Sequence, residues 1–199
     1  MTTRPLAERR ITLANALTAF RPVVAAPLML ACAAEGWREA FPWILAASFA
    51  SDAVDGTVAR LSGQVTRFGA MLDSWADVVA YCAIAIGVAV LWPGLVRAEA
   101  VAVAIIVASF LVPSAVGLLR FGHFTSYHTL LVKAAVATMA PALLLALWTG
   151  ISWPLRIAAA LAVLAALEEI AITCILDRPR SNVRGLRAVL RERRAARRS

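Results

Sequence analysis

The sequence predicts an all-α integral membrane protein with six transmembrane helices and both termini in the cytoplasm. Hydrophobic residues fill 61% of the 199 positions and charged residues only 16%, a balance typical of polytopic membrane proteins and not of soluble domains. Six stretches are long and apolar enough to cross a bilayer. They lie at about 12–33, 40–60, 69–93, 97–119, 128–149 and 154–176. We therefore expect a membrane domain over residues 1–177 and a basic cytoplasmic tail over residues 178–199.

The first apolar stretch is expected to remain as a helix and not to be removed as a signal peptide. It carries the polar residues Asn15, Thr18 and Arg21 and has no small-residue cleavage site. The other five stretches follow at short intervals, so no separate soluble module is expected between them.

The distribution of arginine predicts the orientation. Short loops rich in Lys and Arg stay on the cytoplasmic side. With six spans, most arginines outside the membrane fall on one side: Arg4, Arg9, Arg10, Arg60, Arg67, Arg120 and the nine from Arg178 to Arg198. The other side has Arg38, Arg97 and Arg156, and five tryptophans gather near it: Trp37, Trp43, Trp92, Trp148 and Trp153. We expect a multi-pass protein of a bacterial-type inner (plasma) membrane.

Four aspartates interrupt the second and third apolar stretches, in DAVDGTVARLSGQVTRFGAMLDSWAD (52–77). Asp52 and Asp55 are three residues apart, and Asp73 and Asp77 are four apart. On α-helices each pair shares one face. Two helices packed antiparallel around the turn between them would bring the four carboxylates together at their cytoplasmic ends.

Such a cluster of acids predicts a cation site. An aspartate at the centre of a spanning helix costs roughly 2.5 to 3.5 kcal/mol, and four carboxylates also repel one another. Carboxylate oxygens suit Mg²⁺ or Mn²⁺ better than soft metals, and a shared carboxylate would leave room for two ions. Solvated loop positions are the alternative for the aspartates, and a cation or proton transporter is the alternative class of protein.

Small and basic residues beside the aspartates suggest a bound ligand. Gly56 and Ala59 share the face of Asp52 and Asp55, and Gly69 would allow a close approach where the third stretch begins. Small residues also serve ordinary helix packing. Arg60 and Arg67 could hold phosphates, or could simply mark the cytoplasmic side.

Together these residues read Asp52-x2-Asp55-Gly56-x2-Ala59-Arg60-x8-Gly69-x3-Asp73-x3-Asp77. The pattern resembles the complete signature of the CDP-alcohol phosphotransferase (CDP-alcohol phosphatidyltransferase) family, with all eight positions at the family's spacings. The six-span layout and the segment NALTAFRPVVAAPL (15–28) extend the resemblance over most of the chain. That segment is similar to the corresponding region of bacterial phosphatidylglycerophosphate synthases.

The resemblance implies an enzyme that transfers a phosphatidyl group from CDP-diacylglycerol to an alcohol and releases CMP. It makes Asp52, Asp55, Asp73 and Asp77 metal ligands for Mg²⁺ or Mn²⁺, and Asp77 also the candidate general base. The implied CDP-donor site consists of Gly56, Ala59, Arg60, Thr66 and Gly69. A degenerate, scaffolding family member would lack a motif aspartate, and none is missing here.

The acceptor is predicted less sharply. The segment RFGHFTSYHTLLVK (120–133) contains Lys133, the only lysine of the chain, a turn or so into an apolar stretch. Together with Arg120, Ser126 and Thr129, Lys133 could bind an anionic acceptor such as glycerol 3-phosphate. The Thr/Lys pattern is similar to the corresponding region of phosphatidylglycerophosphate synthases. Snorkelling to the interface is the alternative for Lys133.

Other acceptors stay open. Val78 follows the last motif aspartate, where phosphatidylglycerophosphate synthases often have a basic residue. The stretch LDSWADVV (72–79) resembles the matching stretch of phosphatidylserine synthases. Serine, inositol phosphate and phosphatidylglycerol are therefore alternatives to glycerol 3-phosphate. Glu168 and Glu169 point about 100° apart, and we expect one to pair with a buried Arg or Lys and the other to lie near the headgroups.

The expected partners are the two substrates and membrane lipids. The tail RPRSNVRGLRAVLRERRAARRS (178–199) could bind nucleic acid, but an arginine-rich segment directly after a membrane span favours anionic headgroups. We therefore expect no nucleic-acid partner. Homodimers are common in the family that the chain resembles, so a homodimer is compatible with the resemblance.

Overall fold

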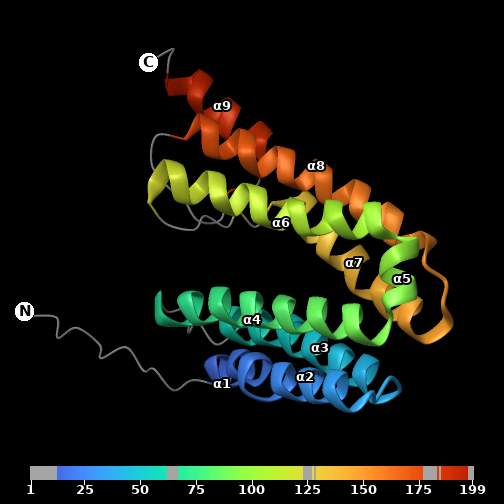
Figure 1. Cartoon of the computed structure of the whole chain (residues 1–199). Coiled ribbons are helices and arrows are strands. Elements are labelled where there is room, and N and C mark those ends of the chain that lie inside the picture. Colours follow the sequence, from blue (N-terminus) through green and yellow to red (C-terminus); the bar gives the residue numbers. More distant parts are fainter. Residues whose placement is uncertain are drawn as a thin grey trace, which may run out of the picture. The chain divides into compact units, whose positions relative to one another are not determined.

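A computed structural model describes residues 13–61, 67–122, 127, 129–176, 183 and 185–196. Within these ranges every regular element is a helix and none is a strand (Figure 1). The chain divides into two compact units, residues 1–93 and 94–199.

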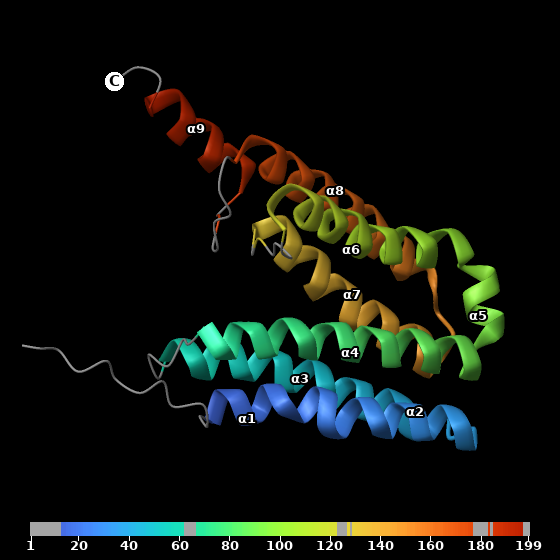
Figure 2. The same ribbon diagram turned by 60° about the vertical axis from the view of Figure 1, so that its left-hand side comes forward.

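Unit 1 is a small bundle whose first member is a long helical segment in three parts. These parts are α1 (Leu13–Phe20), the π-helix η1 (Arg21–Ala25) and α2 (Ala26–Glu35). Both α3 (Ala40–Leu61) and α4 (Arg67–Leu91) pack against this segment, as Figures 1 and 2 show. The first segment therefore contacts both helices that carry the aspartates.

The π-helix has a local cause in the sequence. Pro22 has no N–H, so it cannot complete the α-helical hydrogen bond to the carbonyl of Thr18. The wider turn absorbs this gap, with the N–H of Ala26 bonding the carbonyl of Arg21, and the helix then continues. Arg21 is thereby placed at the start of the irregular turn.

Close packing holds α3 against α4 at the end away from the aspartates. A Cβ added at Gly87 of α4 would lie 2.1 Å from the Phe41 ring of α3. The missing side chain lets the α4 backbone approach that ring. Phe41 also packs against Trp92, with ring centroids 5.6 Å apart.

Unit 2 is arranged around α8 (Trp153–Ile175), which contacts α6 (Ala100–Phe121), α7 (Leu130–Thr149) and α9 (Leu186–Ala196). The short helix α5 (Pro93–Ala98) begins at the boundary between the units. Small side chains explain the close contact, because the buried face of α8 is rich in alanine. At its N-terminal end α8 packs in a cluster of buried residues formed by Ala142, Ala146, Leu155 and Ala158.

The helices agree with the predicted apolar stretches, and four are long and apolar enough to cross a membrane. These four are Asn15–Glu35, Ala100–Phe121, Leu130–Thr149 and Trp153–Ile175. The other two predicted spans correspond to α3 and α4, whose apolar parts, Ala40–Val54 and Trp75–Leu91, are shorter. The aspartate motif occupies the C-terminal part of α3 and the N-terminal part of α4.

Candidate functional site

Two aspartates from different helices meet at the guanidinium group of Arg21. Nη1 of Arg21 lies 2.9 Å from Oδ1 of Asp52 in α3. The same nitrogen donates a hydrogen bond to Oδ1 of Asp77 in α4. Because one nitrogen contacts both oxygens, the two carboxylates are close enough to share a ligand. The structure thus brings together one aspartate from each predicted pair.

Burial differs between the positive and negative groups of this cluster. The side chain of Arg21 is 4% exposed, whereas those of Asp52 and Asp77 are 42% and 36% exposed. A buried charge is stable only when it is paired, so Arg21 needs these carboxylates. The carboxylates, in contrast, keep an open side that a ligand from outside the bundle can reach.

A second polar contact fixes Asp52 relative to the first helix. The hydroxyl of Ser51 donates a hydrogen bond of 2.8 Å to the carbonyl of Leu17 in α1. This bond lies one residue before Asp52 and joins α3 to α1. It limits how far α3 can slide or rotate, and so helps to hold the carboxylate near Arg21.

The other two motif aspartates are placed by backbone only. Asp55 lies one turn after Asp52 in α3, and Asp73 lies one turn before Asp77 in α4. Their side chains lie outside the part of the chain that the structure describes. Among the side chains that are described, no group of three or more His, Cys, Asp or Glu residues forms a metal-binding cluster.

The donor chemistry of this region fits a hard divalent cation. Carboxylate oxygens are the ligands that Mg²⁺ and Mn²⁺ prefer. The four motif aspartates and Arg21 together carry a formal charge of −3. Arg21 therefore offsets only part of the negative charge, and a divalent cation at the open side of Asp52 and Asp77 would offset most of the rest.

The predicted CDP-donor residues flank the same region. Gly56, Ala59 and Arg60 lie on the last turns of α3, and Gly69 lies half-buried in the first turn of α4. The side chains of Ala59 and Arg60, and the whole of Thr66, lie outside the described residues. Their roles stay predictions.

The predicted acceptor residues lie in unit 2, where Lys133 and Thr129 have very different environments. Lys133 is exposed in the first turns of α7. Thr129 is fully buried, and its hydroxyl caps α7 by accepting a 3.2 Å hydrogen bond from the N–H of Val132. Lys133 is thus available to a ligand, whereas the hydroxyl of Thr129 has a structural partner.

Arg120, at the end of α6, also has structural partners. Its Nη2 donates a 3.2 Å hydrogen bond to the carbonyl of Leu176, just past α8. Its guanidinium carbon lies 5.8 Å from the centre of the Phe121 ring. Arg120 therefore ties the ends of α6 and α8 together. Ser126, the remaining predicted acceptor residue, lies outside the described residues.

Within the described part of the chain Glu168 and Glu169 both accept hydrogen bonds from backbone N–H groups, and the expected pairing of one of them with an Arg or Lys stays a prediction. Oε1 of Glu168 accepts a 3.0 Å hydrogen bond from the N–H of Leu186, the first residue of α9. Oε1 of Glu169 accepts one of 3.2 Å from the N–H of Tyr127. The 100° between them explains why each reaches a different segment.

Arg21 is the site residue whose role the sequence did not reveal. The signal was present, since an arginine in an apolar stretch must find a negative partner. Its partners are 31 and 56 residues further along the chain, too far for spacing within one helix to identify. Only the packing of η1 against α3 and α4 identifies Asp52 and Asp77 as the partners of Arg21.

The comparisons with known proteins agree with the motif. The family model described as CDP-alcohol phosphatidyltransferase matches residues 11–175. A phosphatidylinositol phosphate synthase of Cutibacterium acnes is 36% identical over 67 residues, which are 34% of this chain and 32% of the relative. The match thus covers about a third of the relative's length. No solved structure matches the chain.

Proposed function

The chain belongs to the CDP-alcohol phosphatidyltransferase family, and we propose that it transfers a phosphatidyl group from CDP-diacylglycerol to an alcohol with release of CMP. The observation that carries this proposal is the convergence of Asp52 and Asp77 on Arg21 within the complete family motif. This contact joins motif residues of α3 and α4 at one point.

In the proposed reaction the hydroxyl oxygen of the acceptor attacks the phosphorus that carries the diacylglycerol. The bond from that phosphorus to the oxygen of CMP breaks, and CMP leaves with the electron pair. Asp77 accepts the hydroxyl proton. Positioning and charge stabilisation carry most of phosphoryl transfer, so no covalent intermediate on the protein is needed.

Asp52, Asp55, Asp73 and Asp77 would hold Mg²⁺ or Mn²⁺, with room for two ions. A bound divalent cation supplies charge neutralisation at the pyrophosphate and at the departing phosphate of CMP. Gly56, Ala59, Arg60, Thr66 and Gly69 would seat the CDP group beside this centre. Arg21 holds Asp52 and Asp77 close together from the buried side.

We propose an alcohol that carries a phosphate as the acceptor, with glycerol 3-phosphate as the first candidate. The exposed ammonium group of Lys133, near the start of α7, supports an anionic acceptor. The name of the Cutibacterium relative adds inositol phosphate as the second candidate, because both are phosphorylated alcohols. Serine and phosphatidylglycerol remain alternatives.

The six-span topology, with both termini and the site facing the cytoplasm, is part of the proposal. It is supported by the helices over all six apolar stretches and by four exposed tryptophans on the opposite side of the predicted topology. These are Trp37, Trp43, Trp148 and Trp153. Location in a bacterial-type inner membrane and homodimer formation are likewise proposed from the family.

The deciding experiment incubates purified protein with Mg²⁺ or Mn²⁺, CDP-diacylglycerol and one acceptor at a time. CMP release is measured together with the mass of the new lipid. We expect CMP and a phosphatidyl product with one phosphorylated alcohol, and neither without the divalent ion. Absence of CMP with every acceptor would contradict the proposed activity.

A further inference from the structure

We propose that helix α9 is a binding surface for the headgroups of anionic phospholipids, attached to α8 by Glu168. The surface is defined by the exposed residues Arg187, Leu190, Arg191 and Arg193. The inference does not depend on the proposed reaction, because it concerns the attachment and charge of a helix outside the aspartate motif.

The first turn of α9 is bonded to α8. Oε1 of Glu168 accepts a 3.0 Å hydrogen bond from the N–H of Leu186. A carboxylate at this position is also stabilised by the positive, N-terminal end of the helix dipole. Gly185 makes the close approach possible, because its φ is 150° and an added Cβ would lie 3.1 Å from Oε1 of Glu168.

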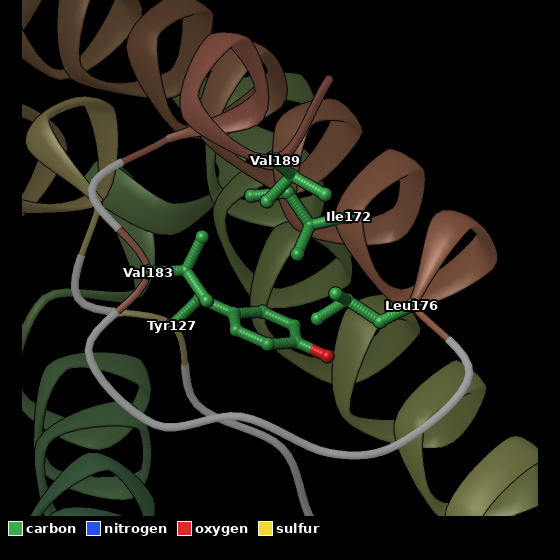
Figure 3. Packing of buried hydrophobic residues seen from close by; sticks show 5 residues of the cluster. All are labelled: Tyr127, Ile172, Leu176, Val183 and Val189. Carbon is green, nitrogen blue, oxygen red and sulfur yellow. The ribbon is translucent and has the colours of Figure 1, made fainter. Parts of the chain in front are cut away.

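The apolar side of α9 is buried against the end of α8. Val189 packs in a cluster with Ile172 and Leu176, which also includes Tyr127 and Val183, as Figure 3 shows. The hydroxyl of Thr173 in α8 lies 3.4 Å from that of Tyr127. Helix α9 is therefore a docked element of unit 2 over its first turns.

This attachment sets the depth of α9 relative to a membrane-crossing helix. Glu168 lies seven residues before the end of α8 at Ile175, which is about 10 Å along the helix. Because carboxylates are costly in hydrocarbon, Glu168 and Glu169 mark these last two turns as interfacial. The first turns of α9 lie beside them, at the level of lipid headgroups.

The exposed side of α9 has the chemistry of an interfacial helix. Arg187 and Arg191 are four residues apart and share one face. Leu190, which is 37% exposed, lies beside them. Positive charge next to a partly exposed apolar residue is the pattern of helices that lie in anionic bilayers. Nucleic acid would also match the charge, but headgroups are the anions within reach of a helix attached to a membrane span.

The test uses the full chain in nanodiscs of phosphatidylcholine alone or mixed with phosphatidylglycerol. Hydrogen exchange of the amides of residues 187–196 is followed by mass spectrometry. We expect exchange about thirtyfold slower in the anionic nanodiscs, the size expected when two arginines engage an anionic surface. Phosphatidylserine should have the same effect as phosphatidylglycerol, and high salt should abolish it.

Variants separate lipid binding from attachment. The double variant Arg187→Gln, Arg191→Gln should lose the lipid-dependent protection, whereas the matched control Arg38→Gln, Arg97→Gln, also two exposed arginines, should keep it. Glu168→Ala should speed exchange of α9 in both lipid compositions, because it removes the acceptor of the Leu186 N–H.

Equal exchange in the two membranes would overturn the proposal, as would full lipid-dependent protection in the Arg187→Gln, Arg191→Gln protein. Protection that appears only when single-stranded RNA is added would assign the face to nucleic acid and also overturn it. CMP release under the same conditions reports separately on the proposed reaction.

Discussion

Acidic residues interrupt the apolar helices in both units of this protein, and their partners differ. In unit 1 the carboxylates of Asp52 and Asp77 contact a buried arginine and stay more than a third exposed. In unit 2 the carboxylates of Glu168 and Glu169 accept hydrogen bonds from backbone N–H groups. The two aspartates share one arginine and are open on one side, which suits a cation site. The two glutamates are bonded to backbone amides and so join separate segments of the chain.

The largest effect that separates the two kinds of acid is expected from Asp77→Asn. Activity should fall by about 100-fold or more, because the change removes a predicted metal ligand and the predicted base. CMP release from CDP-diacylglycerol measures this loss. Glu169→Gln is the matched control and should keep most of the activity. Near-normal turnover in the Asp77→Asn protein would show that the aspartates of unit 1 do not differ in function from the glutamates of unit 2.

The next largest effect is expected from Arg21→Gln. Removing the buried guanidinium leaves two partly exposed carboxylates facing each other, at an expected cost of about 2 kcal/mol in the free energy of unfolding. Thermal unfolding in detergent measures this cost. Added Mg²⁺ should restore more stability to the variant than to the unchanged protein. No loss of stability on Arg21→Gln would show that the arginine does not hold the carboxylates together.

A smaller effect is expected at Lys133, an exposed cation of unit 2. Lys133→Ala should raise the KM for the anionic acceptor by about tenfold, with kcat and stability little changed, because one charge contact to the acceptor is lost. Steady-state kinetics with varied acceptor measures it. Thr129→Ala should instead lower stability by about 1 kcal/mol through loss of the helix cap. An unchanged acceptor KM in the Lys133→Ala protein would exclude this lysine from the acceptor site.

The smallest effect concerns a further acidic residue, Glu99, which precedes α6. Hydrogen bonds from Arg156 at 3.0 and 3.1 Å and from Ser152 at 2.7 Å hold the pKa of Glu99 below its ordinary value of 4.5. A carboxyl group whose pKa is lower in the folded than in the unfolded protein stabilises the fold above the unfolded-state pKa. That stability is lost as the pH falls through the folded-state pKa.

We therefore expect the unfolding temperature to decline as the pH falls below about 4.5, and part of this decline to disappear in Glu99→Gln. Melting curves at several pH values check this for both proteins. Identical pH dependence in the two would show that Glu99 contributes no acid-sensitive stability.

Much of the fold and part of the site were predictable from the sequence. The stretch expected at 128–149 is α7 (Leu130–Thr149), and the one at 154–176 is α8 (Trp153–Ile175), because hydropathy is a property of consecutive residues. The spacing of Asp52 and Asp55 placed both on one helix for the same local reason. The short helix α5 was not expected, because six residues are too few for a periodic pattern.

The sequence by itself determined where the apolar helices lie and which residue types form the family motif, since both follow from short-range order along the chain. Only the tertiary structure decided which partner each charged group takes. Arg21 and Asp77 are 56 residues apart, and Glu168 and Leu186 are 18 apart. Such pairs form only because packing brings separate helices together. Electrostatic attraction depends on the distance between two groups in space and not on their separation along the chain.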